Sequence, residues 1–213
     1  MTNRLSRIAS RRGPTQQRAR ERVEQILTVA EAMIVEGGVG SLKTNEIAAR
    51  AGVPVGSLYQ YFAGLEELIA ALVDRYHLRV EEEIVALFAP VESPNGFLAA
   101  LQQSQQVAWD FLLNNRGYRE LWCGAQSWAP LRELDWADTL NNADAMNAAL
   151  VRVFPRVPVG ELRAFCIMVC DSSGSISRMA IGLPELRDDL LSECYSMIVA
   201  RFLEFGRRDM LGQ

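Results

Sequence analysis

Apolar residues recur along most of the chain at the three- and four-residue spacing of an α-helix, whereas few segments alternate apolar and polar positions as a strand does. The first helix is expected over residues 14–36, with one apolar face made of Val23, Ile26, Leu27, Ala30 and Ile34 and an end at Gly37 and Gly38. Further helices are expected at 44–51, 55–61, 65–88, 96–114, 118–127, 130–153, 159–182 and 186–208, separated by Gly, Pro and Asn. The sequence therefore predicts an all-α protein of about nine helices.

Two of these helices, at 44–51 and 55–61, are short and lie close together in the sequence. The positions expected to face inward are apolar or small: Ile47, Ala48, Ala51, Leu58 and Phe62. Thr44 can cap the first helix with its hydroxyl, Gly52 permits the positive φ that ends it, and Pro54 supplies a fixed φ for the start of the second. Two short helices joined by so tight a turn predict a helix-turn-helix motif.

Three aromatic rings, Tyr59, Tyr61 and Phe62, crowd the end of the second short helix. Phe62 lies four residues after Leu58 and is expected to pack inward with it. Tyr59 and Tyr61 are off that face, so their hydroxyls are expected to reach DNA phosphates while their rings pack on the sugar edge. The alternative is that all three rings only fill the contact with a neighbouring helix.

The charge of the chain is distributed unevenly. The whole chain has a net charge of −4, but residues 1–22 carry seven arginines and one glutamate, a net charge of +6, which leaves −10 for the rest. The arginines are Arg4, Arg7, Arg11, Arg12, Arg18, Arg20 and Arg22. A basic arm on an acidic body indicates a polyanionic partner for one end only. The alternative for the arm is a disordered, solubilising tail.

The stretch "TNEIAARAGVPVGSLYQYFAGLEELIAALV" resembles the N-terminal DNA-binding domain of TetR-type transcriptional regulators, and the likeness extends over about residues 20–73. The usual pattern there is a Thr-capped helix with Ile-Ala, then Ala-Gly-Val, a small polar residue, Gly-Ser/Thr-Leu-Tyr-x-Tyr/His-Phe, and Lys-Glu-x-Leu at the start of the next helix. The resemblance implies a three-helix N-terminal domain before a larger helical domain. The expected limits are a disordered basic arm at 1–13, a helix-turn-helix DNA-binding domain at 14–62, and an effector-binding and dimerisation domain at 63–213.

The resemblance also implies roles for individual residues in DNA binding. Val55, Gly56 and Gln60 take base-facing positions, and Asn45 is placed to reach a base or a phosphate. The positions implied to contact phosphates are Thr44, Ser57, Tyr59 and Tyr61. The chemistry agrees with these roles, because a glutamine can pair with the edge of adenine and a valine can contact a thymine methyl group. The basic arm is placed to enter the adjacent minor groove.

Two residues depart from the family pattern. Leu65 stands where the family commonly has a lysine at the start of the next helix, which removes one phosphate contact. Pro54 stands where a serine or threonine is usual, so the helix expected at 55–61 lacks a hydroxyl cap. Pro54 is still one of the residues predicted to lie at the DNA interface. Both changes are expected to weaken the affinity for DNA of any sequence. Contacts between DNA and the arginines of the basic arm can compensate for this loss.

The middle of the chain contains all four tryptophans, Trp109, Trp122, Trp128 and Trp136. With the polar residues Asp110 and Gln126 between them, they fit an apolar ligand pocket that has a few polar anchors. The alternative is that they only fill the core. A pocket of this composition predicts a flat, mainly apolar or aromatic effector, neutral or cationic, rather than a phosphorylated metabolite.

The last two helices carry long apolar stripes. In this family two such helices usually dimerise as a four-helix bundle, so the stripes are expected to form a homodimer interface. The residues assigned to it are Leu162, Phe165, Val169, Ile176, Leu191, Cys194, Ile198 and Phe202.

The rest of the candidate chemistry is sparse. One histidine, His77, and four cysteines without CxxC spacing do not suggest a metal site, and no catalytic set or cofactor is expected. The cysteines, Cys123, Cys166, Cys170 and Cys194, are expected to be reduced and mostly in the core. No apolar run reaches the ~18–20 residues that span a bilayer, and no signal peptide is found. We expect a cytoplasmic protein that is not an enzyme and has no membrane partner.

Together these features predict a homodimeric, ligand-responsive transcriptional regulator. The preferred form is a repressor that binds a palindromic operator in double-stranded DNA and is released by a small hydrophobic or aromatic effector. Two alternatives stay open: a relative of the fold that has lost DNA binding and acts as a sensor or enzyme, and a DNA-binding protein without a ligand.

Overall fold

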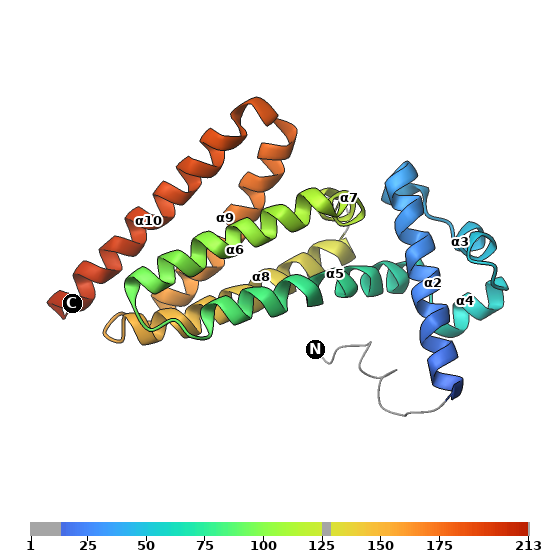
Figure 1. The fold of residues 1–213 in the computed structure, drawn as a ribbon, viewed down its shortest axis with the longest axis horizontal. Coiled ribbons are helices and arrows are strands. Elements are labelled where there is room, and N and C mark those ends of the chain that lie inside the picture. Colours follow the sequence, from blue (N-terminus) through green and yellow to red (C-terminus); the bar gives the residue numbers. More distant parts are fainter. Residues whose placement is uncertain (1–13, 125–128, 213) are drawn as a thin grey trace. The chain divides into compact units, whose positions relative to one another are not determined.

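The computed structural model describes residues 14–124 and 129–212, and within them the chain is helical, with no strand (Figure 1). The helices are α2 (Pro14–Gly37), α3 (Thr44–Arg50), α4 (Val55–Tyr61), α5 (Leu65–Phe88), α6 (Pro94–Asn114), α7 (Arg116–Gly124), α8 (Ala129–Val153), α9 (Val159–Gly182) and α10 (Arg187–Leu211). Short 3-10 turns lie at Val39–Ser41 and Pro184–Leu186. The predicted all-α fold is confirmed, and the predicted helices agree with these limits to within a few residues. The predicted basic arm, 1–13, lies outside the described residues.

The largest differences from the predicted limits are at helix ends. Helix α6 begins at Pro94 rather than at residue 96, because Ser93 Oγ accepts a hydrogen bond from the Gly96 backbone N–H at 3.1 Å. Helix α10 continues to Leu211 and ends at Gly212, which has a φ of 69°. The prediction that Thr44 caps α3 is wrong: Lys43 occupies the cap position and no side chain caps the helix.

The packing of the helix-turn-helix agrees with the prediction. The inward positions Ile47, Ala48, Ala51, Leu58 and Phe62 are all buried. Gly52 has a φ of 63°, and the Val53 N–H then donates to the Ala48 carbonyl at 2.9 Å. This backbone bond closes the turn tightly, so the direction of α4 is fixed relative to α3.

The chain divides into two compact units, of which unit 1 comprises residues 1–77 and 115–134. Its core is apolar, and every residue on the predicted face of α2 is buried. Glu31 on α2 accepts hydrogen bonds from the Arg75 guanidinium and the Tyr76 hydroxyl on α5. A Cβ atom at Gly117 on α7 would meet the Tyr76 hydroxyl oxygen at 2.8 Å, so a larger residue at position 117 would require the Tyr76 side chain or α7 to shift. The domain limit expected at residue 62 remains a prediction.

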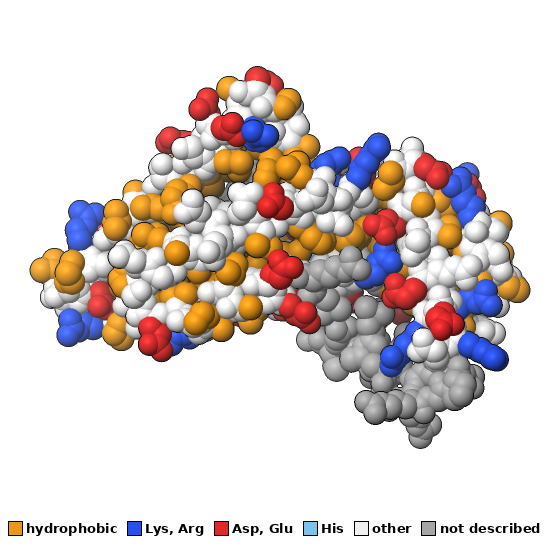
Figure 2. Space-filling model, viewed as in Figure 1, with side chains coloured by type: hydrophobic (Ala, Val, Ile, Leu, Met, Phe, Trp, Pro, Cys, Tyr) orange, Lys and Arg blue, Asp and Glu red, His pale blue; other side chains and the backbone are white. Residues whose placement is uncertain are grey.

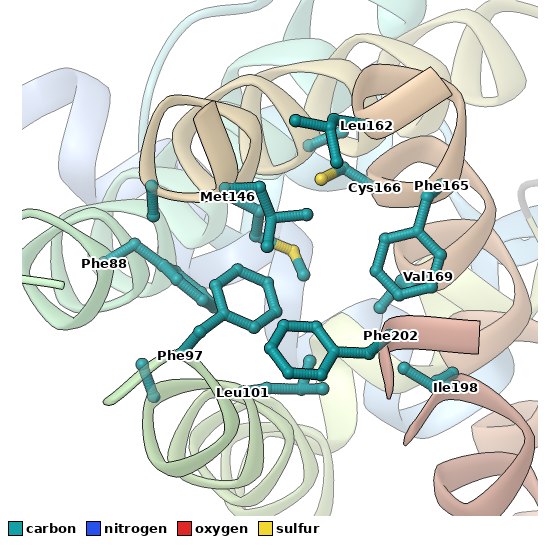
Figure 3. Packing of buried hydrophobic residues seen from close by; sticks show 14 of the residues in the cluster. Phe88, Phe97, Leu101, Met146, Leu162, Phe165, Cys166, Val169, Ile198 and Phe202 are labelled. Atoms are coloured by element: carbon teal, nitrogen blue, oxygen red, sulfur yellow. The ribbon is translucent and has the colours of Figure 1, made fainter. Parts of the chain in front are cut away.

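Unit 2 comprises residues 78–114 and 135–213 and has its own core, drawn from α5, α6, α8, α9 and α10. Phe97 and Phe202 stack with ring centroids 5.2 Å apart, and Figure 3 shows this pair beside Leu101 and Phe88. Arg152 on α8 donates to the carbonyl groups of Phe88, Ala89 and Val91, which lie at the end of α5 and just after it. No described helix has both the length and the apolar character needed to cross a membrane.

Candidate functional sites

The residues predicted to contact DNA lie on α3, on α4 and in the turn between them. Tyr59 is 52% exposed. Asn45, Pro54, Gly56 and Gln60 are also exposed, while Thr44, Val55, Ser57 and Tyr61 are half-buried. Leu58 and Phe62 are buried on the other face of the motif. The motif therefore separates a face that holds the fold together from a face that is open to a partner.

Two of the predicted phosphate contacts lie together. The Thr44 and Tyr59 hydroxyl oxygens are 3.4 Å apart, although fifteen residues separate them in the sequence. This contact joins the start of α3 to the exposed side of α4. The two hydroxyls therefore present one polar point at which an anionic oxygen can accept a hydrogen bond from either of them.

Gly56, on the exposed face of α4, is not required by the fold. A Cβ atom built there would meet nothing within 4 Å, and φ at this residue is not positive. Glycine costs stability inside a helix relative to alanine. Its presence is therefore unexplained by packing within the chain, and it leaves the backbone of α4 bare toward solvent.

The charged residues near this face are partly neutralised. Arg50 at the end of α3 pairs with Glu36 at 2.5 Å and with Glu46 at 2.9 Å, and hydrogen bonds to these two carboxylates raise the pKa of the guanidinium. Lys43, directly before α3, is exposed. Leu65 at the start of α5 is half-buried and supplies no charge.

The residues predicted to line a ligand pocket are divided between the two units. Trp109 on α6 and Trp136 on α8 belong to unit 2, and Trp136 is 56% exposed. Asp110 is exposed and accepts a hydrogen bond from Gln106 of its own helix at 2.9 Å. Trp122 belongs to unit 1, where its ring stacks on Tyr118 with centroids 6.4 Å apart. Gln126 and Trp128 lie outside the described residues, so a pocket formed by the whole set stays a prediction.

Polar side chains on α8 in unit 2 are partly or largely withdrawn from solvent. The Asn142 amide N–H donates to the Asp138 carboxylate at 3.1 Å. Burial is the first cause that raises the pKa of Asp138, to about 7, and the nearby charges of Asp135 and Glu81 add to it. The side-chain carbonyl oxygens of Asn142 and Asn147 are buried and have no hydrogen-bond partner in the described part of the chain.

The predicted dimer-interface residues are mostly buried within their own chain. Leu162, Phe165, Val169, Cys194, Ile198 and Phe202 belong to the unit 2 core, while Ile176 and Leu191 are half-buried. Side chains already packed in this core have little surface left to offer a second chain. The exposed large apolar residues on the same two helices are Val159, Met168 and Met179 on α9 and Met197, Leu203, Met210 and Leu211 on α10. Figure 2 shows hydrophobic side chains at the surface along α10.

The other predicted features are found as follows. Cys166 and Cys194 are buried and Cys170 is half-buried, but Cys123 is exposed, so it is not part of the core. His77 is half-buried, with its ring 5.9 Å from that of Tyr118. Among the described residues no group of three His, Cys, Asp or Glu side chains is placed to hold a metal ion.

The helix-turn-helix and the helical body that follows it define the class of protein, that of the helix-turn-helix regulators. The family model "Bacterial regulatory proteins, tetR family" matches residues 26–72. The matched segment contains α3, α4 and the turn between them, so the likeness to this family lies in the helix-turn-helix. Nucleoid occlusion factor SlmA of Pasteurella multocida is 28% identical over 112 residues, which are 52% of this chain and 55% of that protein. The chain spans about half or less of the length of the curated relatives it matches.

Solved structures share the fold over most of the chain. SmeT, the repressor of the Stenotrophomonas maltophilia multidrug efflux pump SmeDEF, is 24% identical with a TM-score of 0.67, covering 84% of this chain and 89% of that one. A complex of SmeT with triclosan also matches. FadR of Bacillus subtilis in complex with stearoyl-CoA is 18% identical with a TM-score of 0.59, covering 81% of this chain and 97% of that one. At these identities the likeness shows the fold alone.

Proposed function

We propose that this protein is a transcriptional regulator that binds double-stranded DNA through the exposed face of α3 and α4. The observation that carries the proposal is that Gly56, Tyr59 and Gln60 form an exposed face on α4 for which the fold itself has no use. A bare backbone at Gly56 lets α4 approach the floor of the major groove. Gln60 and Val55 then read base edges, and Asn45 reaches a base or a phosphate.

The polar rim of the same face positions the protein on the DNA backbone. Thr44 and Tyr59, with hydroxyl oxygens 3.4 Å apart, bind one phosphate, and Ser57 and Tyr61 bind others. The basic arm, residues 1–13, adds a minor-groove contact that replaces the cation absent at Leu65. Contacts of this kind fix register and orientation, while Gln60 and Val55 carry the sequence preference.

The protein acts as a homodimer on a palindromic operator. One recognition helix contacts too few bases to select a site among genomic competitors, and two helices in a symmetric dimer read two half-sites. Exposed apolar side chains at Met168, Met179, Met197 and Leu203 support an interface on α9 and α10. In this proposal the dimer interface uses exposed residues of α9 and α10, next to the buried residues of the same helices that the sequence analysis assigned to it.

The protein is a cytoplasmic repressor that a small molecule releases from DNA. Two fold relatives support a ligand-binding body, since SmeT is crystallised with triclosan and FadR with stearoyl-CoA. The effector binds in the helical body and biases the dimer toward a spacing of the recognition helices that cannot span two half-sites. No catalytic role is proposed.

Fluorescence anisotropy with a labelled duplex from upstream of the gene tests DNA binding, using Tyr59→Phe as the variant. Loss of one phosphate contact should weaken binding to this duplex and to a scrambled duplex by the same factor. Leu113→Ala, an exposed change on α6 in unit 2, is the control and should bind as the wild type does. Equal affinity of Tyr59→Phe and wild type for both duplexes would remove Tyr59 from the interface, and no binding by the wild type would refute the function.

A further inference from the structure

Helix α2 begins well before the core of unit 1. Val23 is the first buried residue among the described side chains of this helix. Five of the six side chains at 17–22 are exposed, and the sixth, that of Ala19, is half-buried. These early turns of α2 therefore add little to the core, and their side chains are open to a partner.

Two arginines lie on one side of these turns. Arg18 and Arg22 are four residues apart in the helix, and both are exposed. Neither has a hydrogen bond or an ion pair with any residue in the described part of the chain. The acids near them in the sequence are engaged elsewhere, since Glu21 accepts a hydrogen bond from Gln17 at 3.0 Å and Glu24 pairs with an arginine of α5 at 3.4 Å.

The stability of α2 does not explain these arginines. Like charges four residues apart on a helix repel each other and destabilise it. The first turn of α2 also has no acidic residue, although the positive end of the helix dipole favours a carboxylate there. An anion supplied by a partner would offset the repulsion between the two guanidinium groups.

The composition of these turns favours DNA over a membrane surface. A helix that lies on a membrane needs a large apolar face, and residues 14–22, PTQQRARER, contain no Leu, Ile, Val, Met or aromatic side chain. The same turns belong to unit 1, which also contains α3 and α4. In Figure 1 the start of α2 lies at the level of α4, and Figure 2 shows Lys and Arg side chains at that end of the unit.

We propose that Arg18 and Arg22 form a second phosphate-binding surface, which binds the DNA backbone beside the bases that α4 reads. The planar guanidinium group of an arginine can donate two N–H groups to one phosphate. This surface is part of a helix that continues into the core of unit 1, so it is distinct from the basic arm at 1–13. It adds affinity without sequence preference, because phosphates carry no base information. The inference rests on the proposed function, since it adds residues to the same DNA interface.

The salt dependence of DNA binding by the full chain tests this surface. Fluorescence anisotropy is measured at several salt concentrations with the duplex from upstream of the gene and with a scrambled duplex. Arg18→Gln and Arg22→Gln should each reduce the slope of log affinity against log salt concentration by about 0.9, and the double variant by about 1.8, equally for both duplexes. Between about 50 and 200 mM salt, the wild type should therefore lose about tenfold more affinity than the double variant.

Arg20→Gln is the matched control. Arg20 lies on the same turns but on the opposite side of the helix from Arg18 and Arg22, and it has an interaction of its own. Its slope should equal that of the wild type. The double variant Arg18→Lys with Arg22→Lys keeps both charges and should keep most of the slope. Thermal melting of the glutamine double variant should match that of the wild type, because the two side chains are exposed.

Two results would overturn the proposal. One is a wild-type slope in the glutamine double variant. The other is an equal loss of slope in Arg20→Gln and Arg18→Gln, which would indicate a flexible polycation rather than a surface on one side of α2.

The surface and the regulator fail in different ways. No binding of the wild type to any duplex would refute both. Binding of the wild type to DNA, with an unchanged slope in the glutamine double variant, would refute only the surface. If that variant binds DNA as the wild type does but no longer binds vesicles of phosphatidylserine that the wild type binds, the arginines serve an anionic membrane instead.

Discussion

The exposed face of the helix-turn-helix and the interior of unit 2 present their polar groups in opposite ways. On α4, Tyr59 and Gln60 point outward from a motif whose inner face is wholly apolar. In unit 2, Asp138 and Asn142 are half-buried on α8 and bonded to each other, and the buried amide oxygen of Asn142 has no hydrogen-bond partner among the described residues. The first arrangement leaves polar groups open to a large partner, and the second withdraws polar groups into the packing of the fold.

This difference has a consequence for stability. Changing an outward residue of α4 removes a contact with the partner and leaves the core intact. Changing a residue inside unit 2 alters the packing of the fold itself. Variants on the exposed face of α4 should therefore keep the melting temperature of the wild type, whereas variants in the apolar core of unit 2 should lower it, even where both kinds of variant abolish regulation.

The largest effect is expected for Phe202→Glu. Phe202 is buried and stacks on Phe97, so the variant places a charge in the unit 2 core and should lower the free energy of unfolding by at least ~4 kcal/mol. Thermal melting followed by circular dichroism measures the loss. Met197→Glu, at a 59% exposed position of the same helix, is the matched variant, which should stay folded but sediment as a monomer. A folded Phe202→Glu monomer would return Phe202 to the dimer interface.

Gly56→Ala should weaken DNA binding by about 1–3 kcal/mol without loss of stability, because the added methyl group overpacks the contact with the groove. Anisotropy with a duplex that the wild type binds measures the change in affinity. Gly160→Ala on α9 is the control, since a Cβ atom there also meets nothing within 4 Å. If both variants bind like the wild type, the backbone of α4 does not approach DNA.

Asp138→Asn should stabilise the protein above neutral pH and leave it unchanged in acid. The pKa of Asp138 is raised to about 7 in the folded state, so folding favours the protonated form, and this contribution is lost as the pH rises through 7. Removing the charge should then increase the free energy of unfolding by ~1–3 kcal/mol at pH 8 and by almost nothing near pH 4. Urea denaturation at the two pH values measures the difference. A gain that is equal at both values would mean that the Asp138 charge is not the cause.

The smallest effect is expected for Leu65→Lys, which supplies the cation that the start of α5 lacks. One added phosphate contact should steepen the dependence of log affinity on log salt concentration by about 0.9. Anisotropy titrations at several salt concentrations give this slope. Leu65→Gln, which changes the shape without the charge, should leave the slope unaltered, and an unaltered slope in Leu65→Lys would show that position 65 does not face DNA.

The sequence predicted the fold well because helix punctuation is local. Pro54, Gly52 and the glycines after α2 act within a few residues of their own positions, and the structure places turns at each of them. The cap at Thr44 was misplaced by one residue, since only the geometry shows that Lys43 is the residue before the first turn.

The interior of unit 2 could not be predicted in the same way. An apolar stripe such as Leu162, Phe165 and Val169 is the same in sequence whether it packs in the chain's own core or against a second chain. Asn142 and Asp138 have helical spacing, which predicts that they lie on one side of α8. Whether the Asn142 side-chain oxygen finds a hydrogen-bond donor depends on which groups of the neighbouring helices face it. Tertiary packing decides both the partner of an apolar stripe and the partner of a buried polar atom. Neither can be predicted from the periodicity of a single helix.

Selection of duplexes from a random-sequence pool by the full-length protein tests the central claim, that the exposed face of α4 reads DNA, most directly. Wild type should enrich a two-fold symmetric motif. Gln60→Ala should enrich the same motif with preference relaxed at one symmetric pair of positions, by ~1–3 kcal/mol of discrimination. A pool that stays random with the wild type, or an identical motif for both proteins, would contradict the claim.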